Sequence, residues 1–121
     1  MKLAAVVLAA GASRRLGRPK QLEPVGGEPL LRRAARCALE AGYHPVRVVL
    51  GAVPEAALAL DGLRVETCQN EDWAEGMASS IRLGTRDLPP DTEGVLLLVC
   101  DQVALEPGVL NHLRDAFEAC P

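Results

Sequence analysis

The sequence is poor in aromatic residues, lysine and long apolar runs, and each shortage argues against a class of function. Tyr43, Trp73 and Phe117 are the only aromatics among 121 residues, so a surface on which single-stranded bases stack is not expected. Lysine occurs twice against eleven arginines, and the net charge of −3 argues against a nucleic-acid partner bound through a basic surface. No apolar stretch approaches the roughly eighteen residues that span a bilayer, so no membrane partner is expected.

The cysteines do not form a metal or disulfide pattern. The sequence has four of them, widely spaced and without a C-x-x-C pair: Cys37, Cys68, Cys100 and Cys120. This spacing predicts free thiols in a reducing cytoplasm. The apolar run from Leu3 to Ala10 is short for a secretory signal and is followed at once by arginines, so we interpret it as part of the folded domain.

The chain does contain enough apolar residues for one compact domain over residues 1–121, since 49% are hydrophobic. Continuous apolar runs predict strands at residues 3–8 and 95–99, a β-branched run predicts one at 46–50, and a further strand is predicted at 63–67. Helical spacing and terminal Pro or Gly residues predict helices at residues 29–41, 54–60, 75–86 and from 107 to about 117. This alternation predicts an open, doubly wound α/β sheet with helices on both faces, in three layers. Ligands of such sheets bind beyond the carboxyl ends of the strands.

The loop after the first predicted strand has the composition of a phosphate-binding segment. Gly11 and Gly17 permit close backbone approach, and Ser13 offers a hydroxyl. Four cations follow within seven positions: Arg14, Arg15, Arg18 and Lys20. The spacing is neither that of a Walker A loop nor the G-x-G-x-x-G of dinucleotide folds. We therefore predict a polyphosphate ligand, against the alternative of a solvated basic loop.

Two further segments carry candidate ligands. Asp101 ends the most apolar predicted strand, at the same edge as Gly11 if the two strands are parallel, and its carboxylate could hold Mg²⁺ or cap a turn. In the stretch NEDWAEGMASSIRLG, Asn70, Ser79 and Ser80 could bind a base or sugar. Trp73 and Met77 in the same stretch are interpreted as packing residues.

These motifs resemble a known family. LAAGASRRLGRPKQL is similar to the signature loop of the nucleotidyltransferases that activate the molybdenum cofactor, the MobA-like domain, and isoprenoid-pathway cytidylyltransferases share a similar loop. NEDWAEGMASSI followed by VLLLVCDQ resembles the cytidylyltransferase branch, whereas the guanylyl branch typically has Gly where this chain has Ala10. The resemblance covers most of the chain and implies a Rossmann-like nucleotidyltransferase fold.

The resemblance implies a cytoplasmic enzyme that transfers CMP from CTP to the terminal phosphate of molybdopterin, with Mg²⁺ as cofactor and pyrophosphate as product. Arg14, Lys20 and Asp101 are the expected catalytic residues, with Asp101 as the metal ligand. The expected nucleotide-binding residues are Leu8, Ala9, Ala10, Gly11, Ser13, Arg14, Lys20, Asn70, Ser79 and Ser80.

Two departures from the family pattern qualify this expectation. Val103 stands where the family usually has Pro after CDQ, and the sequence ends at Pro121, before the family's Gly-His-Pro motif and second metal-binding acid. We therefore expect an N-terminal part of the domain that binds nucleotide and transfers it poorly. Two alternatives remain open: transfer to another small phosphate, such as a sugar phosphate or isoprenoid precursor, and a non-catalytic module that docks on molybdenum hydroxylases or their maturation factors.

Overall fold

The computed structural model describes residues 2–10, 24–25, 28–99 and 115. Within them, four strands form a parallel sheet in the order β5-β4-β1-β6. Their bounds are β1 (Leu3–Ala9), β4 (Val46–Leu50), β5 (Glu66–Gln69) and β6 (Gly94–Val99). The order in which strands are added reverses at β1, because β4 and β5 lie on one side of it and β6 on the other. This order confirms the predicted doubly wound fold.

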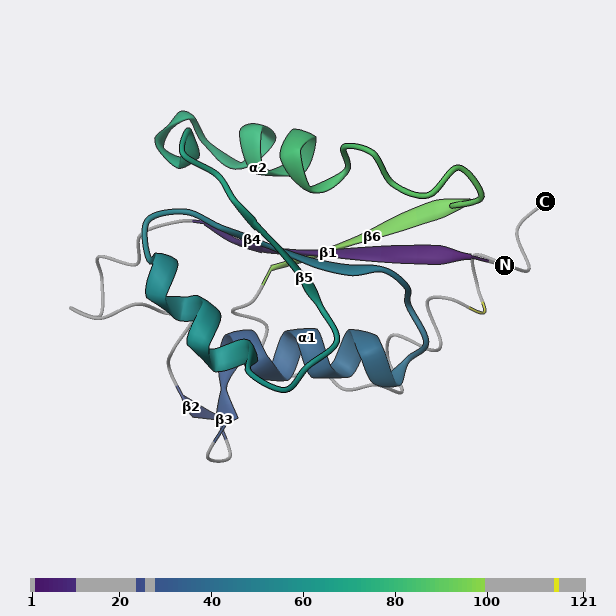
Figure 1. Cartoon of the computed structure of the whole chain (residues 1–121), viewed down its shortest axis with the longest axis horizontal. Helices are drawn as coiled ribbons and strands as arrows, with labels where there is room; N and C mark the ends of the chain where they lie inside the picture. Colours follow the sequence, from purple (N-terminus) through teal and green to yellow (C-terminus); the bar gives the residue numbers. More distant parts are fainter. Residues whose placement is uncertain (1, 11–23, 26–27, 100–114, 116–121) are drawn as a thin grey trace.

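Helices cover both faces of the sheet, as Figure 1 shows. The helix α1 (Leu30–Glu40) and the 3-10 helix η2 (Pro54–Leu60) lie on one face. On the other face lies α2 (Met77–Gly84), preceded by the 3-10 turn η3 (Trp73–Glu75). A two-stranded antiparallel ladder of β2 (Pro24–Val25) and β3 (Glu28–Pro29) precedes α1. Among the described helices, none has the length and apolar character needed to span a membrane.

Strand β1 is the centre of the core, and each of its residues is buried. Alternate side chains enter two different apolar clusters, as the strand period of two requires. Leu3, Ala5, Val7 and Ala9 belong to the cluster beneath α1 and η2, whereas Val6, Leu8 and Ala10 belong to the cluster beneath α2. The continuous apolar run in the sequence therefore reflects a strand that is covered on both faces.

The backbone geometry after α1 explains why Gly42 marks the end of this helix, as predicted. Gly42 has a φ of +87°, and its N–H donates to the carbonyl of Leu39 at 3.1 Å. The next N–H, that of Tyr43, donates to the carbonyl of Ala38 at 3.2 Å. Together these bonds form a Schellman motif, which glycine favours because it adopts positive φ without strain.

Several predicted boundaries differ from the observed ones. The third strand starts at Glu66 rather than at residue 63, since Leu63 and Val65 pack against the core from the turn before it. The helix predicted at 75–86 starts at Met77, because Gly76, with φ +110° and ψ 179°, separates it from η3. Of the helix predicted from residue 107, only Asp115 lies within the described residues.

Strand β6 is less enclosed than its apolar sequence suggests. Leu98 is buried and Leu96 packs against the cluster beneath α1, but Val95, Leu97 and Val99, on the opposite face, are 37–42% exposed. The reason is that α2 lies over β1 and β4: a Cβ built on Gly84 of α2 would be 2.5 Å from Val6 Cγ1 and 3.0 Å from Val49 Cγ2.

Candidate functional site

The carboxyl edge of the sheet brings together the strand ends that the sequence analysis singled out. β1 and β6 are neighbours and parallel, with Leu8 paired to Val99. The loop that begins at residue 11 and the segment with Asp101 therefore leave adjacent strands at one edge, at the point where the strand order reverses. Ligands of open α/β sheets bind in the crevice at this point. Gly11, Ser13, Arg14, Lys20 and Asp101 themselves lie outside the described residues.

The first predicted nucleotide-binding residues are buried at this edge. Leu8, Ala9 and Ala10 are 8%, 3% and 6% exposed, and their side chains belong to the two core clusters. The carbonyl of Ala10 accepts a hydrogen bond from the N–H of Ala52 at 2.9 Å, which ties the end of β1 to the loop after β4. Contacts of this segment with a ligand would therefore have to come mainly from its backbone.

The predicted base or sugar ligands Asn70, Ser79 and Ser80 do lie together, and they bind one another. Asn70 Nδ2 donates to Ser79 Oγ at 2.9 Å and to Ser80 Oγ at 3.0 Å, while its Oδ1 accepts from the N–H of Asp72 at 2.9 Å. Ser79 Oγ also contacts the carbonyl of Gly76 at 2.8 Å. All three side chains are buried, at 8% exposure or less. The network holds the turn between β5 and α2 in one conformation.

We expect Asn70→Ala to lower the free energy of unfolding by about 2–3 kcal/mol, because it removes the amide that bonds the buried hydroxyls of Ser79 and Ser80 and the N–H of Asp72. Chemical denaturation followed by circular dichroism measures the loss. Gln69→Ala is the matched control, since this neighbouring residue is exposed and its amide donates to the carbonyl of Gly51 at 2.9 Å. Equal losses in the two variants would contradict a structural role for the Asn70 network.

A close approach that the sequence analysis missed also shapes this edge. A Cβ on Gly51, the residue after β4, would be 2.6 Å from the carbonyl oxygen of Ala10 and 2.6 Å from Trp73 Cβ. Trp73 is half-buried and packs against the cluster beneath α2. Three segments that are distant in sequence therefore meet here, at Ala10, Gly51 and Trp73. A glycine directly after an apolar strand was the available signal.

Three arginines outside this edge, Arg32, Arg36 and Arg47, make internal contacts. Arg32 donates to the carbonyls of Ala59 and Asp61 at 3.1 and 2.7 Å. Arg36 makes two hydrogen bonds of 2.9 Å to the carboxylate of Glu28, and this ion pair lowers the pKa of Glu28. Arg47 bonds Glu66 at 2.8 Å and also contacts carbonyls at the end of α2, including that of Gly84 at 3.2 Å.

Neither thiols nor metal ligands form a second centre in the part of the chain that the structure describes. Neither Cys37 nor Cys68 is in a disulfide, as predicted, and burial raises the pKa of the Cys37 thiol, which favours its protonated form. No group of three or more metal-ligating side chains occurs among the described residues. A metal site at Asp101 thus remains a prediction from the sequence.

Comparison with known proteins gives several relatives. The chain is 40% identical over 111 residues to nicotine blue oxidoreductase of Paenarthrobacter nicotinovorans, covering 89% of this chain and 53% of that protein. It is 37% identical to the CMP-5'-(3-aminopropyl)phosphonate synthase of Streptomyces rubellomurinus, over 95% of this chain and 19% of the relative. It is 32% identical to a probable molybdenum cofactor guanylyltransferase of Synechococcus elongatus, over 100% of this chain and 61% of that protein. The chain thus spans about half the length of the first of these relatives.

Solved structures agree in fold. Rv0371c of Mycobacterium tuberculosis superposes with a TM-score of 0.83 at 31% identity, over 98% of this chain and 61% of that one. A crystal structure of the same protein in complex with manganese superposes with a TM-score of 0.75 at 29% identity, over 98% of this chain and 61% of that one. The family model of the MobA-like NTP transferase domain matches residues 5–121. The chain therefore belongs to the MobA-like NTP transferase family and has its Rossmann-like nucleotidyltransferase fold.

Proposed function

We propose that this protein transfers CMP from CTP to the terminal phosphate of the molybdenum cofactor. The observation that carries the proposal is the placement of two strand ends: β1 and β6 are parallel neighbours, and each is followed in sequence by a predicted ligand segment. Membership of the nucleotidyltransferase family supports the reaction class. The LAAG form of the first loop and the NEDWAEGMASS stretch support cytidine as the base.

In the proposed reaction, an oxygen of the acceptor's terminal phosphate attacks the α-phosphorus of CTP. A P–O bond forms there, the bond to the β-phosphate breaks, and pyrophosphate leaves. The backbone of Leu8, Ala9, Ala10 and Gly11 would line the nucleotide, with the Ser13 hydroxyl nearby. Arg14 and Lys20 would bind the triphosphate and stabilise charge on the leaving pyrophosphate. The Asn70, Ser79 and Ser80 network would border the base and ribose.

A divalent metal is part of this proposal. The carboxylate of Asp101 is a hard oxygen donor of the kind that Mg²⁺ and Mn²⁺ prefer, and phosphate oxygens would complete the shell. When bound, such an ion neutralises negative charge on the phosphates. The manganese complex of the mycobacterial relative supports a divalent cation, and we propose Mg²⁺ as the physiological one.

We expect CTP with Mg²⁺ to bind more tightly than GTP with Mg²⁺ in calorimetric titration. The physical reason is that a base site fitted to a one-ring pyrimidine accommodates a two-ring purine less well. The transfer itself is tested by pyrophosphate release from CTP in the presence of molybdopterin. Equal or tighter binding of GTP would contradict the cytidylyl assignment and leave the fold unaffected.

A second acceptor class is favoured by one finding. The Streptomyces relative is named as a CMP-phosphonate synthase, so a small phosphonate or phosphate is a reasonable alternative acceptor for the same chemistry. The pyrophosphate assay separates the two when it is run with molybdopterin and, in parallel, with 3-aminopropylphosphonate. Release with the phosphonate alone would replace the molybdenum cofactor as the proposed acceptor. CTP binding without release in either assay would favour the non-catalytic docking module.

A further inference from the structure

Trp73 lies at the candidate site, and neither core packing nor the proposed transfer accounts for its whole side chain. It is the first residue of η3, in the turn between β5 and α2 at the carboxyl edge. Its Cβ lies so close to Gly51 that this position tolerates no added methyl group, and the same methyl group would approach Ala10. The backbone of Trp73 is therefore fixed against the ends of β1 and β4.

The side chain of Trp73 is only partly used by the protein. It packs against the cluster of Val6, Leu8, Ala10 and Val49, yet it remains half-buried rather than enclosed. Among the hydrogen bonds of the described residues, none involves its indole N–H. Tryptophan N–H groups usually have a partner when the ring is buried, and among the described residues this one has none that would compete with a ligand.

The location of Trp73 relative to the predicted phosphate site indicates which part of a nucleotide it would meet. The residues proposed for the phosphates follow β1 and β6, whereas Gly51 and Trp73 lie on the side of β1 where β4 and β5 are. A nucleotide with its phosphates near β6 would extend its nucleoside toward β4. An aromatic face and an N–H donor suit a flat ring that carries hydrogen-bond acceptors, which describes a nucleobase.

From this arrangement we infer that Trp73 is a binding residue that contacts the base of the bound nucleotide. The inference rests on the proposed function, since it requires a nucleoside triphosphate at this edge. It adds a role that the packing interpretation of Trp73 does not include. A residue that only packs would affect all ligands of the edge alike, whereas a base contact affects only ligands that have a base.

The test compares CTP with inorganic tripolyphosphate, which has the phosphates and no base, both with Mg²⁺. We expect Trp73→Leu to weaken CTP binding about tenfold, because base stacking on an aromatic ring is lost, and to leave tripolyphosphate binding unchanged. Trp73→Phe keeps an aromatic face and should weaken CTP less. Ile81→Ala is the matched control, because Ile81 packs against the same cluster from α2. It should not change the ratio of the two affinities.

A measurement on the unaltered protein avoids dependence on how the variants fold. Trp73 is the sole tryptophan of the chain, so its fluorescence reports this position alone. CTP should change the emission and reduce quenching by acrylamide, whereas tripolyphosphate should do neither. Unchanged emission and quenching with saturating CTP, or equal losses of both ligands in Trp73→Leu, would overturn the inference and leave nucleotide binding intact. If the unaltered protein binds neither ligand, both this inference and the proposed function fail.

Discussion

A Gly51→Ala variant is expected to lose about 3 kcal/mol of unfolding free energy, with a melting temperature lower by about 10 °C. The added Cβ would lie 2.6 Å from the backbone oxygen of Ala10, 2.6 Å from Trp73 Cβ and 2.9 Å from Ala10 Cβ. Two of these atoms belong to Ala10, the residue after β1, whose carbonyl is held by the bond from Ala52, so they cannot move cheaply. Thermal and chemical denaturation measure the effect.

The control for this prediction is Gly62→Ala. A Cβ on Gly62 would meet nothing within 4 Å, but its φ of +83° still disfavours alanine by about 1 kcal/mol. The difference between the two variants therefore isolates the steric cost at the edge. If Gly51→Ala were no less stable than Gly62→Ala, the close approach of β1, β4 and η3 would be wrong.

The second large effect concerns the cations of the loop after β1. Arg14→Ala and Lys20→Ala are each expected to weaken CTP binding by about 1.5–3 kcal/mol, the value of a charge-assisted hydrogen bond to phosphate. By the usual conversion this is roughly tenfold to a hundredfold in the dissociation constant. Calorimetric titration measures the affinity, and the unfolding free energy should stay within about 0.5 kcal/mol of the unaltered protein if the side chains contribute charge and not packing.

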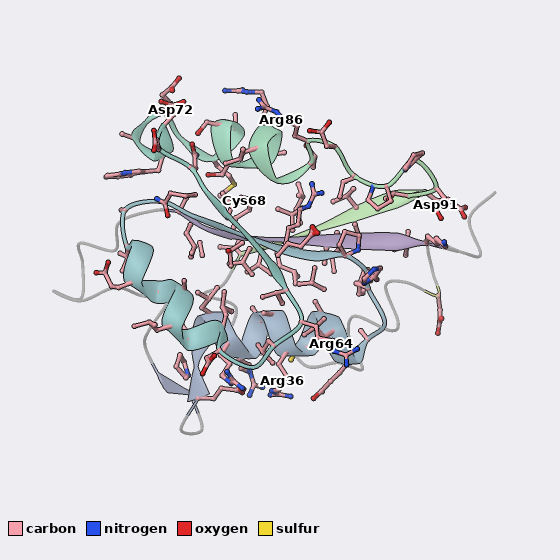
Figure 2. The ribbon with its side chains drawn as sticks, in the orientation of Figure 1. Arg36, Arg64, Cys68, Asp72, Arg86 and Asp91 are labelled. Atoms are coloured by element: carbon pink, nitrogen blue, oxygen red, sulfur yellow. The ribbon has the colours of Figure 1, made fainter. Side chains whose placement is uncertain are left out.

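Arg64→Ala is the charge-matched control for these two variants. Arg64 is exposed in the turn before β5, at the opposite edge of the sheet from Ala10, and is labelled in Figure 2. Its removal makes the net charge more negative by the same single unit but should leave CTP affinity nearly unchanged. A similar loss of affinity in all three variants would mean that the loop acts through the general field of the protein and makes no direct phosphate contact.

The parts of the fold that the sequence predicted well are those in which one physical pattern dominates. β1 is buried on both faces, so its apolar run continues without alternation, and the predicted bounds 46–50 match β4, which is buried except at Arg47. Residues 30–40 form α1 because apolar positions recur at helical spacing and Gly42 ends them. The short ladder of β2 and β3 was missed, although the Gly26-Gly27 pair between its strands is a hairpin signal.

The candidate site was predicted less completely, for a different reason. Residue type indicated that Asn70, Ser79 and Ser80 belong together, and they do meet, but the sequence does not reveal whether polar groups bind one another or a ligand. Gly51 and Trp73 became informative only when the structure placed them beside Ala10. Their closeness depends on packing between segments that are far apart in sequence, which no local pattern reports.

The central place of β1 has a consequence for synthesis of the protein. β1 is made before the other described strands, yet Leu3 pairs with Gly94 and Leu8 with Val99, so one of its two edges has no partner until almost the whole described chain has left the ribosome. Until then β1 can pair with β4 alone, and an apolar strand edge stays open to other chains. Such long-range pairing also slows folding. The emerging polypeptide is therefore expected to depend on chaperones that bind apolar segments during translation.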